Sequence, residues 1–189
     1  MKKNINALVL AAIIGLLIVA VGLGFLFGPA NPVPWILIGV LITIVVVYRW
    51  ISSRDRVEWK ESYTVGVDDL DDDHKRLIEL INRFQTAYTY HTGEEFEHQA
   101  LNELVDYTKY HFEREEKMME EAGYPDLAAH KEIHRTMIAK VGEFQEEYQR
   151  TGHEALEGVA KFLSEWLINH INGIDKKYGP YVSRRQASV

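Results

Sequence analysis

Four segments between residues 59 and 180 repeat apolar residues with the 3.6-residue period of an α-helix. Each apolar face also carries at least one histidine. The stretches AGYPD (122–126) and TGH (151–153) interrupt the pattern and are typical of helix ends. The four faces contain His74, Leu77, Ile78, Ile81, Phe84 and Tyr88; Leu101, Leu104, Thr108, His111, Glu115 and Met118; Leu127, His130, His134, Met137, Val141, Phe144 and Tyr148; and Val159, Leu163, Trp166, Leu167, His170 and Ile174. Four amphipathic helices with short connections predict an all-α, antiparallel four-helix bundle.

Glu115 lies on one of these apolar faces, one helical turn after His111. An ionised carboxylate in an apolar interior is costly unless a cation compensates its charge. Neutral imidazoles supply no cation, and protonated imidazoles repel one another. A single histidine on such a face is typical of an ordinary core residue, but this combination predicts a bound metal.

The candidate metal ligands outnumber what one ion accepts from a protein. They are His74, His111, Glu115, His130, His134, His170 and Asp175. They suit two ions that share two bridging carboxylates. The chain has no cysteine, which excludes thiolate sites, and nitrogen and oxygen donors fit iron, manganese, zinc or copper. An imidazole-rich site with carboxylate bridges and an open position favours iron.

Asp175 does not share a face with His170 in a regular helix. It lies five residues later, which is about 140° around the helix axis. A local i→i+5 turn, made easier by Gly173, would bring both side chains to one side. We therefore predict a π-type turn here; regular helix through 170–175 would remove Asp175 from the site.

Three further histidines lie in polar surroundings and are expected at the surface: His91, His98 and His153. The stretch EFEH (95–98) supplies one Glu-x-x-His pair, whereas ferritin-like dimetal bundles need two. These histidines are therefore not assigned to the metal site.

Two apolar runs precede the bundle, at residues 7–27 and 35–50, with GPANPVP (28–34) between them. Each predicts a transmembrane helix, at about 5–27 and 33–51, because roughly 20 apolar residues span a bilayer core. We expect a transmembrane hairpin in residues 1–51, a linker at 52–58, the bundle at 59–180 and a polar tail at 181–189. A signal peptide cleaved after GPA and a buried soluble hairpin fit less well, because a second apolar run follows and neither run has a polar face.

The charges divide the chain in the same way. Lys2 and Lys3 precede the first run, Arg49, Arg54 and Arg56 follow the second, and the turn between them has no charge. The positive-inside rule then places both ends in the cytoplasm, as in a multi-pass protein of the inner (cytoplasmic) membrane. Residues 1–56, which also contain Asp55, carry a net charge of +4. Because the whole chain carries −7, residues 57–189 carry −11. An acidic domain argues against nucleic acid as a partner.

Several motifs within the bundle occur together in a known family. They are W…Y-x-V-G-V (Trp59, Tyr63, 65–67), LDDDHKRLIELIN around His74, HFEREEKMM…GYP…HKEIH, and WLINHINGID around His170 and Asp175. In these motifs the chain resembles a hemerythrin, specifically a bacterial one, from about Trp59 to Tyr178, with a membrane anchor in front.

The resemblance implies a hemerythrin-like four-helix bundle with a non-heme di-iron centre that binds O₂ reversibly. It implies one iron on His130, His134 and His170, and a second on His74 and His111, where O₂ would bind. Glu115, Asp175 and an oxo or hydroxo group would bridge the two irons. The O₂ pocket would be walled by Phe112, Trp166, Leu167 and Ile171.

Two positions depart from the family pattern. Asp73 replaces a common glutamine before the first histidine, where it would either orient His74 or, as the simpler alternative, cap the helix N-terminus. Met137 stands where an aromatic residue is common. Neither change alters the expected ligand set.

The expected function is O₂ binding rather than enzymatic catalysis, for O₂ delivery or storage at the membrane. The expected partners are O₂, the lipid bilayer, and a membrane-bound oxidase or oxygenase or a signalling protein. Two alternatives are a di-iron O₂ or redox sensor that acts through a partner, and a slow di-iron oxidase or peroxidase.

Overall fold

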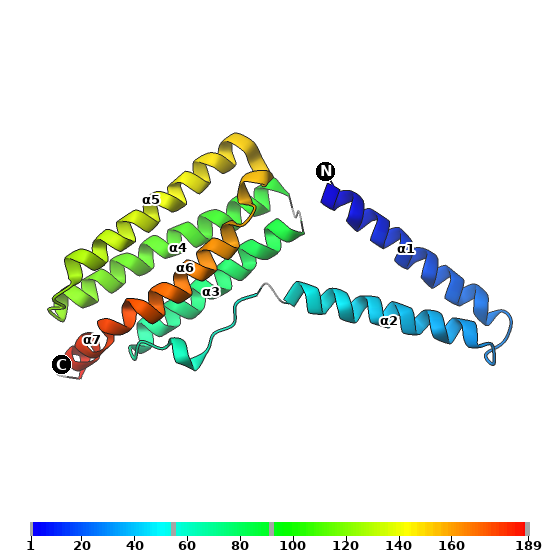
Figure 1. The fold of residues 1–189 in the computed structure, drawn as a ribbon, viewed down its shortest axis with the longest axis horizontal. Coiled ribbons are helices and arrows are strands. Elements are labelled where there is room, and N and C mark those ends of the chain that lie inside the picture. The colour runs from blue at the N-terminus through cyan, green and yellow to red at the C-terminus, as the bar shows by residue number, and fades with distance from the viewer. Residues whose placement is uncertain (1, 54–55, 91–92, 188–189) are drawn as a thin grey trace. The chain divides into compact units, whose positions relative to one another are not determined.

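The computed structural model describes residues 2–53, 56–90 and 93–187, which form two compact units, 1–56 and 57–189 (Figure 1). The first unit contains helices α1 (Lys2–Phe25) and α2 (Pro32–Ser53). The second contains η1 (Glu61–Tyr63), α3 (Asp68–Thr89), α4 (Glu94–Glu121), α5 (Leu127–Thr151), η2 (Gly152–Leu156), α6 (Val159–Gly173), η3 (Asp175–Lys177) and α7 (Gly179–Gln186). Since the described residues include no strand, the predicted all-α class is confirmed.

The four long helices of the second unit lie side by side as a bundle (Figure 1). α3 packs on α4 and α6, and α4 also packs on α5. The predicted apolar faces supply the interior, including Phe84, Leu104, Val141 and Leu163, each exposed by 5% or less. The helical period therefore places the histidines of the same faces inside the bundle.

α3 begins at Asp68, ahead of Asp73, which the sequence offered as a possible N-terminal cap. Val67 is the N-cap residue, and Asp68, Asp69 and Asp71 occupy the first turn, where negative charge is favourable. The Asp71 carboxylate accepts hydrogen bonds from the Thr64 hydroxyl and from the Val65 amide, 2.8 Å away. Asp71 thus fixes the loop that leads into α3.

The segment before α3, residues 57–67, is hydrogen-bonded to the bundle near both of its ends. The Asn82 side chain pairs with both the amide and the carbonyl of Val57, at 2.9 and 2.7 Å. The Lys176 ammonium donates to the Ser62 carbonyl, and the Ser183 hydroxyl donates to the Gly66 carbonyl at 2.6 Å. This segment consequently closes the end of the bundle where η3 lies.

α7 occupies most of the stretch predicted as a polar tail. Val182 is 2% exposed and belongs to the core. A Cβ on Gly179 would lie 2.1 Å from the Val65 carbonyl oxygen, so only glycine permits this close approach of α7 to the loop before α3. The tail differs from the sequence expectation because one buried valine among polar residues is a weak signal.

In the first unit, α1 and α2 form a hairpin. The Asn31 side chain donates to the Gly24 carbonyl (3.3 Å), the Trp35 indole donates to the Pro29 carbonyl (3.2 Å), and Trp35 packs edge-on against Phe25. Large apolar side chains are exposed along both helices, among them Leu16, Val19, Ile36, Ile42 and Val46, and in the turn between them at Leu26 and Phe27. Over the residues described, none of the helices combines the length and apolar character needed to cross a membrane, so the predicted transmembrane spans are not supported.

Candidate metal centre

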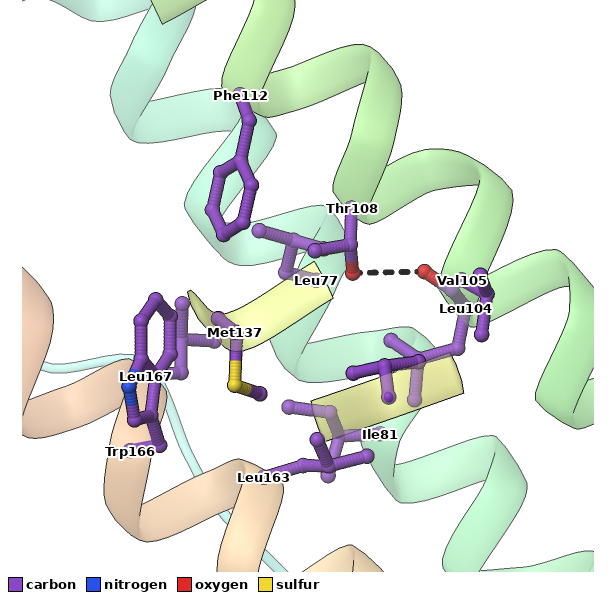
Figure 2. Close-up of a pocket in the computed structure, with 11 residues that line it drawn as sticks. Leu77, Ile81, Leu104, Val105, Thr108, Phe112, Met137, Leu163, Trp166 and Leu167 are labelled. Atoms are coloured by element: carbon purple, nitrogen blue, oxygen red, sulfur yellow. Dashed lines mark hydrogen bonds between the residues drawn. The ribbon is translucent and has the colours of Figure 1, made fainter. Parts of the chain in front are cut away.

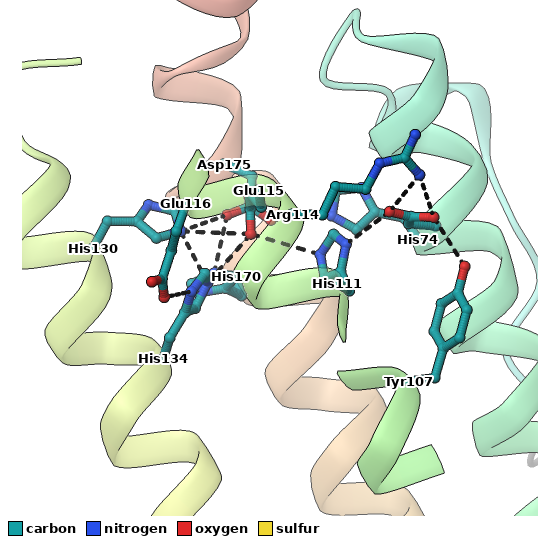
Figure 3. A network of polar contacts seen from close by, with 11 residues as sticks. His74, Tyr107, His111, Arg114, Glu115, Glu116, His130, His134, His170 and Asp175 are labelled. Atoms are coloured by element: carbon teal, nitrogen blue, oxygen red, sulfur yellow. Dashed lines mark hydrogen bonds and ion pairs between the residues drawn. The ribbon is translucent and has the colours of Figure 1, made fainter. Parts of the chain in front are cut away.

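The structure brings all seven predicted ligands together inside the bundle (Figure 3). Each of them is exposed by 4% or less. They come from α3 (His74), α4 (His111, Glu115), α5 (His130, His134), α6 (His170) and η3 (Asp175). The i,i+4 spacing within α4 and within α5 directs both side chains of each pair to one face.

Three histidines, here called the three-histidine group, converge through their Nε2 atoms: His130, His134 and His170. Nε2 of His134 lies 3.0 Å from Nε2 of His130 and 3.1 Å from Nε2 of His170. Nitrogen lone pairs this close repel one another unless a proton or a cation lies between them. The group is therefore arranged to surround a cation.

The two-histidine group consists of His74 and His111, on neighbouring helices. Their ring centroids are 4.8 Å apart and their planes meet at 69°. Nε2 of His111 lies 3.6 Å from Glu115 Oε2, and Nε2 of His74 lies 3.5 Å from Asp175 Oδ2. Both Nε2 atoms thus point toward the carboxylates between the two groups.

Glu115 and Asp175 each contact both groups. Oε2 of Glu115 is also 3.3 Å from His134 Nε2, and Oδ1 of Asp175 is 3.0 Å from His170 Nε2. Glu115 can hold an ion with the three-histidine group and a second ion with the two-histidine group, because the ligand atoms in each set lie within 4.8 Å of one another. The geometry provides for two ions with shared carboxylates.

The polar atoms of the centre are buried without ordinary partners. Within the described part of the chain, both oxygens of Glu115, both oxygens of Asp175 and both nitrogens of His74 make no hydrogen bond. Buried polar atoms in proteins are nearly always paired. Unpaired carboxylate oxygens among imidazole nitrogens are the donor set that a divalent cation would satisfy.

The charges of the centre respond to this burial. Burial alone raises the pKa of the Glu115 carboxyl, but contacts with His130 and His134 outweigh it and hold that pKa well below its ordinary value. Burial alone lowers the pKa values of His74 and His134, but Asp175 and Glu115, respectively, raise both. Burial prevails at His111, whose pKa is lowered. The carboxylates therefore remain ionised and draw positive charge into the site.

Asp175 reaches the site by a route that differs from the predicted one. α6 ends at Gly173, the Ile174 amide bonds to the His170 carbonyl at 2.8 Å (i→i+4), and the 3₁₀ turn η3 starts at Asp175. The predicted π-type turn is wrong. Because α6 ends at Gly173 instead of continuing through a bulge, the position of Asp175 no longer follows the period of the α-helix. Its side chain points into the bundle, where it is fully buried.

An apolar cavity of about 30 Å³ lies inside the bundle beside the centre (Figure 2). Phe112, Trp166, Leu167 and Met137 line it, together with Leu77, Ile81, Leu104, Val105, Thr108, Val141 and Leu163. Phe112 stacks on His134 with ring centroids 3.7 Å apart, and Trp166 stacks on His170 at 4.3 Å. The Thr108 hydroxyl is satisfied by the Leu104 carbonyl (2.8 Å). Of the four predicted pocket residues, Ile171 is fully buried but does not line this cavity.

Comparison with known proteins decides the family. The family profile described as "Hemerythrin HHE cation binding domain" matches residues 65–182, more than half of the chain.

The chain belongs to the hemerythrin family.

Relatives and solved structures agree with this assignment. Bacteriohemerythrin of Stenotrophomonas maltophilia is 39% identical over 128 residues, which cover 66% of this chain and 80% of that protein. Myohemerythrin-1 of Phascolopsis gouldii is 32% identical over 120 residues, which cover 64% of this chain and 89% of that protein. The crystal structure of a wild-type hemerythrin superposes with a TM-score of 0.60 at 30% identity, covering 67% of this chain and 98% of that one.

Two acidic residues outside the predicted ligand set contact histidines of this hemerythrin bundle. Oε1 of Glu116 lies 2.9 Å from Nδ1 of His134. Oδ2 of Asp73 lies 3.5 Å from Nδ1 of His111. Asp73 neither caps α3, whose N-cap is Val67, nor contacts His74, because its position in the second turn directs it to α4. Both predicted roles for Asp73 are therefore corrected.

Other residues near the centre were not identified from the sequence. The Tyr178 ring is 5.7 Å from His130 and fully buried, and burial with the charges of Glu115 and Asp175 raises its pKa well above the ordinary value. Its spacing of three residues from Asp175 was the available signal. Glu116 could not be identified from the helical period, because it directly follows Glu115 and does not itself lie on the apolar face of α4.

Two of the remaining histidines, His98 and His153, are not part of the candidate centre. His98 is exposed, as expected. His153, also expected at the surface, is instead half-buried, and its Nδ1 lies 2.8 Å from the buried carboxylate of Glu97. His91 lies outside the described residues.

Proposed function

We propose that this hemerythrin-family protein binds O₂ reversibly at a di-iron centre. The observation that carries the proposal is the burial of two carboxylates that make no hydrogen bond within the described residues, Glu115 and Asp175, between a group of three histidines and a group of two. His130, His134 and His170 would hold one ion, and His74 and His111 the other. The ions, when bound, would supply the electrons that O₂ takes up reversibly.

The unequal groups support a binding role with one open position. The three-histidine group offers one more protein ligand than the two-histidine group, so a vacant position belongs with His74 and His111. Phe112 stacks on His134, lies 5.8 Å from His111, and forms part of the cavity wall. An apolar cavity beside the centre excludes water. This favours reversible binding of O₂ over its loss as superoxide, which carries a charge.

The cavity supports a binding protein rather than an enzyme. Its lining is apolar except for Thr108, whose hydroxyl is already bonded to the Leu104 carbonyl. General acid–base catalysis needs a titratable group within reach of the bound molecule. The described cavity lining offers none.

For the cellular location, we propose attachment to the cytoplasmic membrane through the α1–α2 hairpin, with the bundle in the cytoplasm. The exposed apolar side chains of both helices and the positive charges flanking them in sequence support this. At this position the protein would deliver or store O₂ for a membrane-bound oxidase or oxygenase. Fractionation of cells that produce the full chain or residues 57–189 tests the proposal. Equal recovery of both in the soluble fraction would overturn it, and carbonate extraction separates spanning from surface attachment.

The O₂ proposal is tested on the purified full chain. Iron analysis should give two ions per chain, and the optical spectrum should change on exposure of the reduced protein to air and return on removal of O₂. Two results would contradict reversible binding. The protein takes up no iron, or its spectrum changes on the first exposure to air and does not return to that of the reduced protein when O₂ is removed. Rapid irreversible oxidation would instead favour the sensor or oxidase alternatives.

A further inference from the structure

The Asp73 carboxylate lies behind His111, on the side away from the centre. Asp73 is 4% exposed, and its Oδ2 is 3.5 Å from His111 Nδ1. On the opposite side of the same ring, Nε2 of His111 faces Glu115 Oε2 at 3.6 Å. The imidazole therefore lies between an outer carboxylate and the carboxylate that belongs to the centre.

The proton of His111 must then be on Nδ1. An imidazole that binds an ion through Nε2 has its lone pair there and its hydrogen on Nδ1. Within the described residues, Nδ1 of His111 is buried and makes no formed hydrogen bond. The 3.5 Å between His111 Nδ1 and Asp73 Oδ2 exceeds the usual 2.7–3.2 Å of an N–H···O bond. A small rotation of the imidazole ring would bring the two atoms within hydrogen-bond distance. Asp73 is the carboxylate placed to accept that bond.

The Asp73 carboxylate is itself held in place by two residues of α4. Nη1 of Arg114 lies 3.0 and 3.1 Å from its two oxygens, and the Tyr107 hydroxyl donates to Oδ1 at 2.9 Å. Burial raises the pKa of Asp73, but the nearby His111 ring, the Tyr107 hydroxyl and the Arg114 charge lower it overall. Burial and Asp73 raise the pKa of Tyr107 to about 12, so Tyr107 remains a donor.

We propose that Asp73 is a positioning residue for the two-histidine group: it accepts a hydrogen bond from His111 Nδ1, fixes the ring with Nε2 toward the ion, and raises the donor strength of that nitrogen. This inference rests on the proposed metal centre. Arg114 opposes the second effect, because it withdraws negative charge from the same carboxylate. Asp73 and Arg114 thus adjust the affinity and reduction potential of one ion of the pair from outside the ligand set.

The experiment uses the metal-free full chain titrated with Co²⁺ or Zn²⁺, which needs no O₂ chemistry. Asp73→Asn keeps the shape of the side chain but removes its charge. Loss of such an outer partner typically weakens metal binding about 10–100-fold, and we expect this loss for the ion at the two-histidine group only. Glu116→Gln is the matched control, since Glu116 contacts His134, and it should weaken the ion at the three-histidine group instead.

The reduction potential of the iron-loaded protein gives a second readout that a purely structural role would not move. Asp73→Asn should raise the potential, because a poorer donor stabilises the oxidised ion less. Arg114→Gln should lower it, because the Asp73 charge is then less neutralised. Opposite shifts support the proposal; equal affinity in Asp73→Asn and wild type, or shifts of the same sign, overturn it.

Two checks keep these outcomes distinct from failure to fold or to bind metal. If Asp73→Asn loses its helicity, the more exposed Arg114→Gln and Tyr107→Phe variants decide the question by their shifts in potential. Imidazole ¹⁵N NMR of the Zn²⁺-loaded wild type must also show a protonated, hydrogen-bonded Nδ1 at His111. A wild type that binds no metal would refute the proposed centre itself, whereas a wild type that binds two ions with Nδ1 free of a hydrogen bond refutes only the role of Asp73.

Discussion

The three-histidine group and the two-histidine group differ although they share both carboxylates. In the first, His134 Nε2 lies within 3.1 Å of the Nε2 atoms of His130 and His170. In the second, the rings of His74 and His111 stand edge to face with centroids 4.8 Å apart. The difference shows how a four-helix bundle makes an asymmetric pair of sites: one helix supplies two histidines a turn apart, while the other three supply one each.

The outer carboxylates differ in the same sense. The Glu116 side chain, behind the three-histidine group, is 24% exposed, whereas the Asp73 side chain, behind the two-histidine group, is 5% exposed. The group with fewer ligands is therefore backed by the more deeply buried carboxylate. Four experiments test this asymmetry, from the largest expected effect to the smallest.

Removal of the shared carboxylate should abolish the asymmetry by emptying both sites. Glu115→Ala deletes a ligand placed within reach of both groups. Metal content by elemental analysis should fall from two ions per chain to almost none. Glu113→Ala, on the exposed side of the same helix, is the control and should keep both. Retention of either ion in Glu115→Ala would show that the two groups bind metal independently of this bridge.

Removal of one histidine should have unequal consequences in the two groups. His74→Ala should leave the ion held by His130, His134 and His170, whereas His134→Ala removes the ligand that contacts both other members of its group. We expect one ion per chain in the first variant and fewer than one in the second, because the two-histidine group that remains offers one protein ligand fewer to its ion. Equal losses in both variants would mean that the groups do not differ in strength.

Filling the apolar cavity should affect O₂ but leave both ions in place. Leu163 lines the cavity and is not a candidate ligand. Leu163→Phe should reduce the rate of O₂ binding in stopped-flow measurements and cost about 1–3 kcal/mol of unfolding free energy from overpacking. An unchanged O₂ rate with an altered thermal midpoint would show that O₂ reaches the two-histidine group by another path.

The metal-free protein should respond to pH in the direction set by its histidines. The pKa values of His74 and His134 are raised above the ordinary 6.5, so the stability that they contribute is fully present below pH 6.5 and is lost as pH rises through their folded values. The lowered pKa of Glu115 adds stability above its ordinary value of 4.5. The lowered pKa of His111 acts in the opposite direction to the raised pKa of His74.

We therefore expect the metal-free protein to be most stable between about pH 4.5 and 6.5, and to lose stability on titration to pH 8. The metal-loaded protein should show the reverse slope, because bound histidines must be deprotonated. Thermal unfolding of both forms across this range checks the signs. A rise in stability of the metal-free form above pH 6.5 would contradict them.

Much of the bundle and of the candidate site could be predicted from the sequence. Helical periodicity is a local property, so it placed His74, His111, His130, His134 and His170 on buried faces before any packing was known. The spacing also placed Glu115 with His111. The family assignment followed from the same residues, because the motifs surround these positions.

Three features could not be predicted, because each depends on which faces meet. Asp175 lies in the site because α6 ends at Gly173, whereas periodicity alone pointed to a π-type turn. Asp73 contacts His111 rather than its neighbour His74, because α3 packs with that side toward α4. Glu97 and His153 pair across 56 residues, a contact that no local pattern reveals.

The sequence by itself determined the helices, their buried faces and the identity of the donor atoms, because all of these follow from the chemistry and spacing of residues a few positions apart. The division of the donors into a group of three and a group of two was expected from the family resemblance, but only the tertiary structure decided the distances between them and which carboxylates lie behind them. The physical reason is that a helix fixes the direction of its own side chains, whereas distances between helices follow from the packing of whole faces.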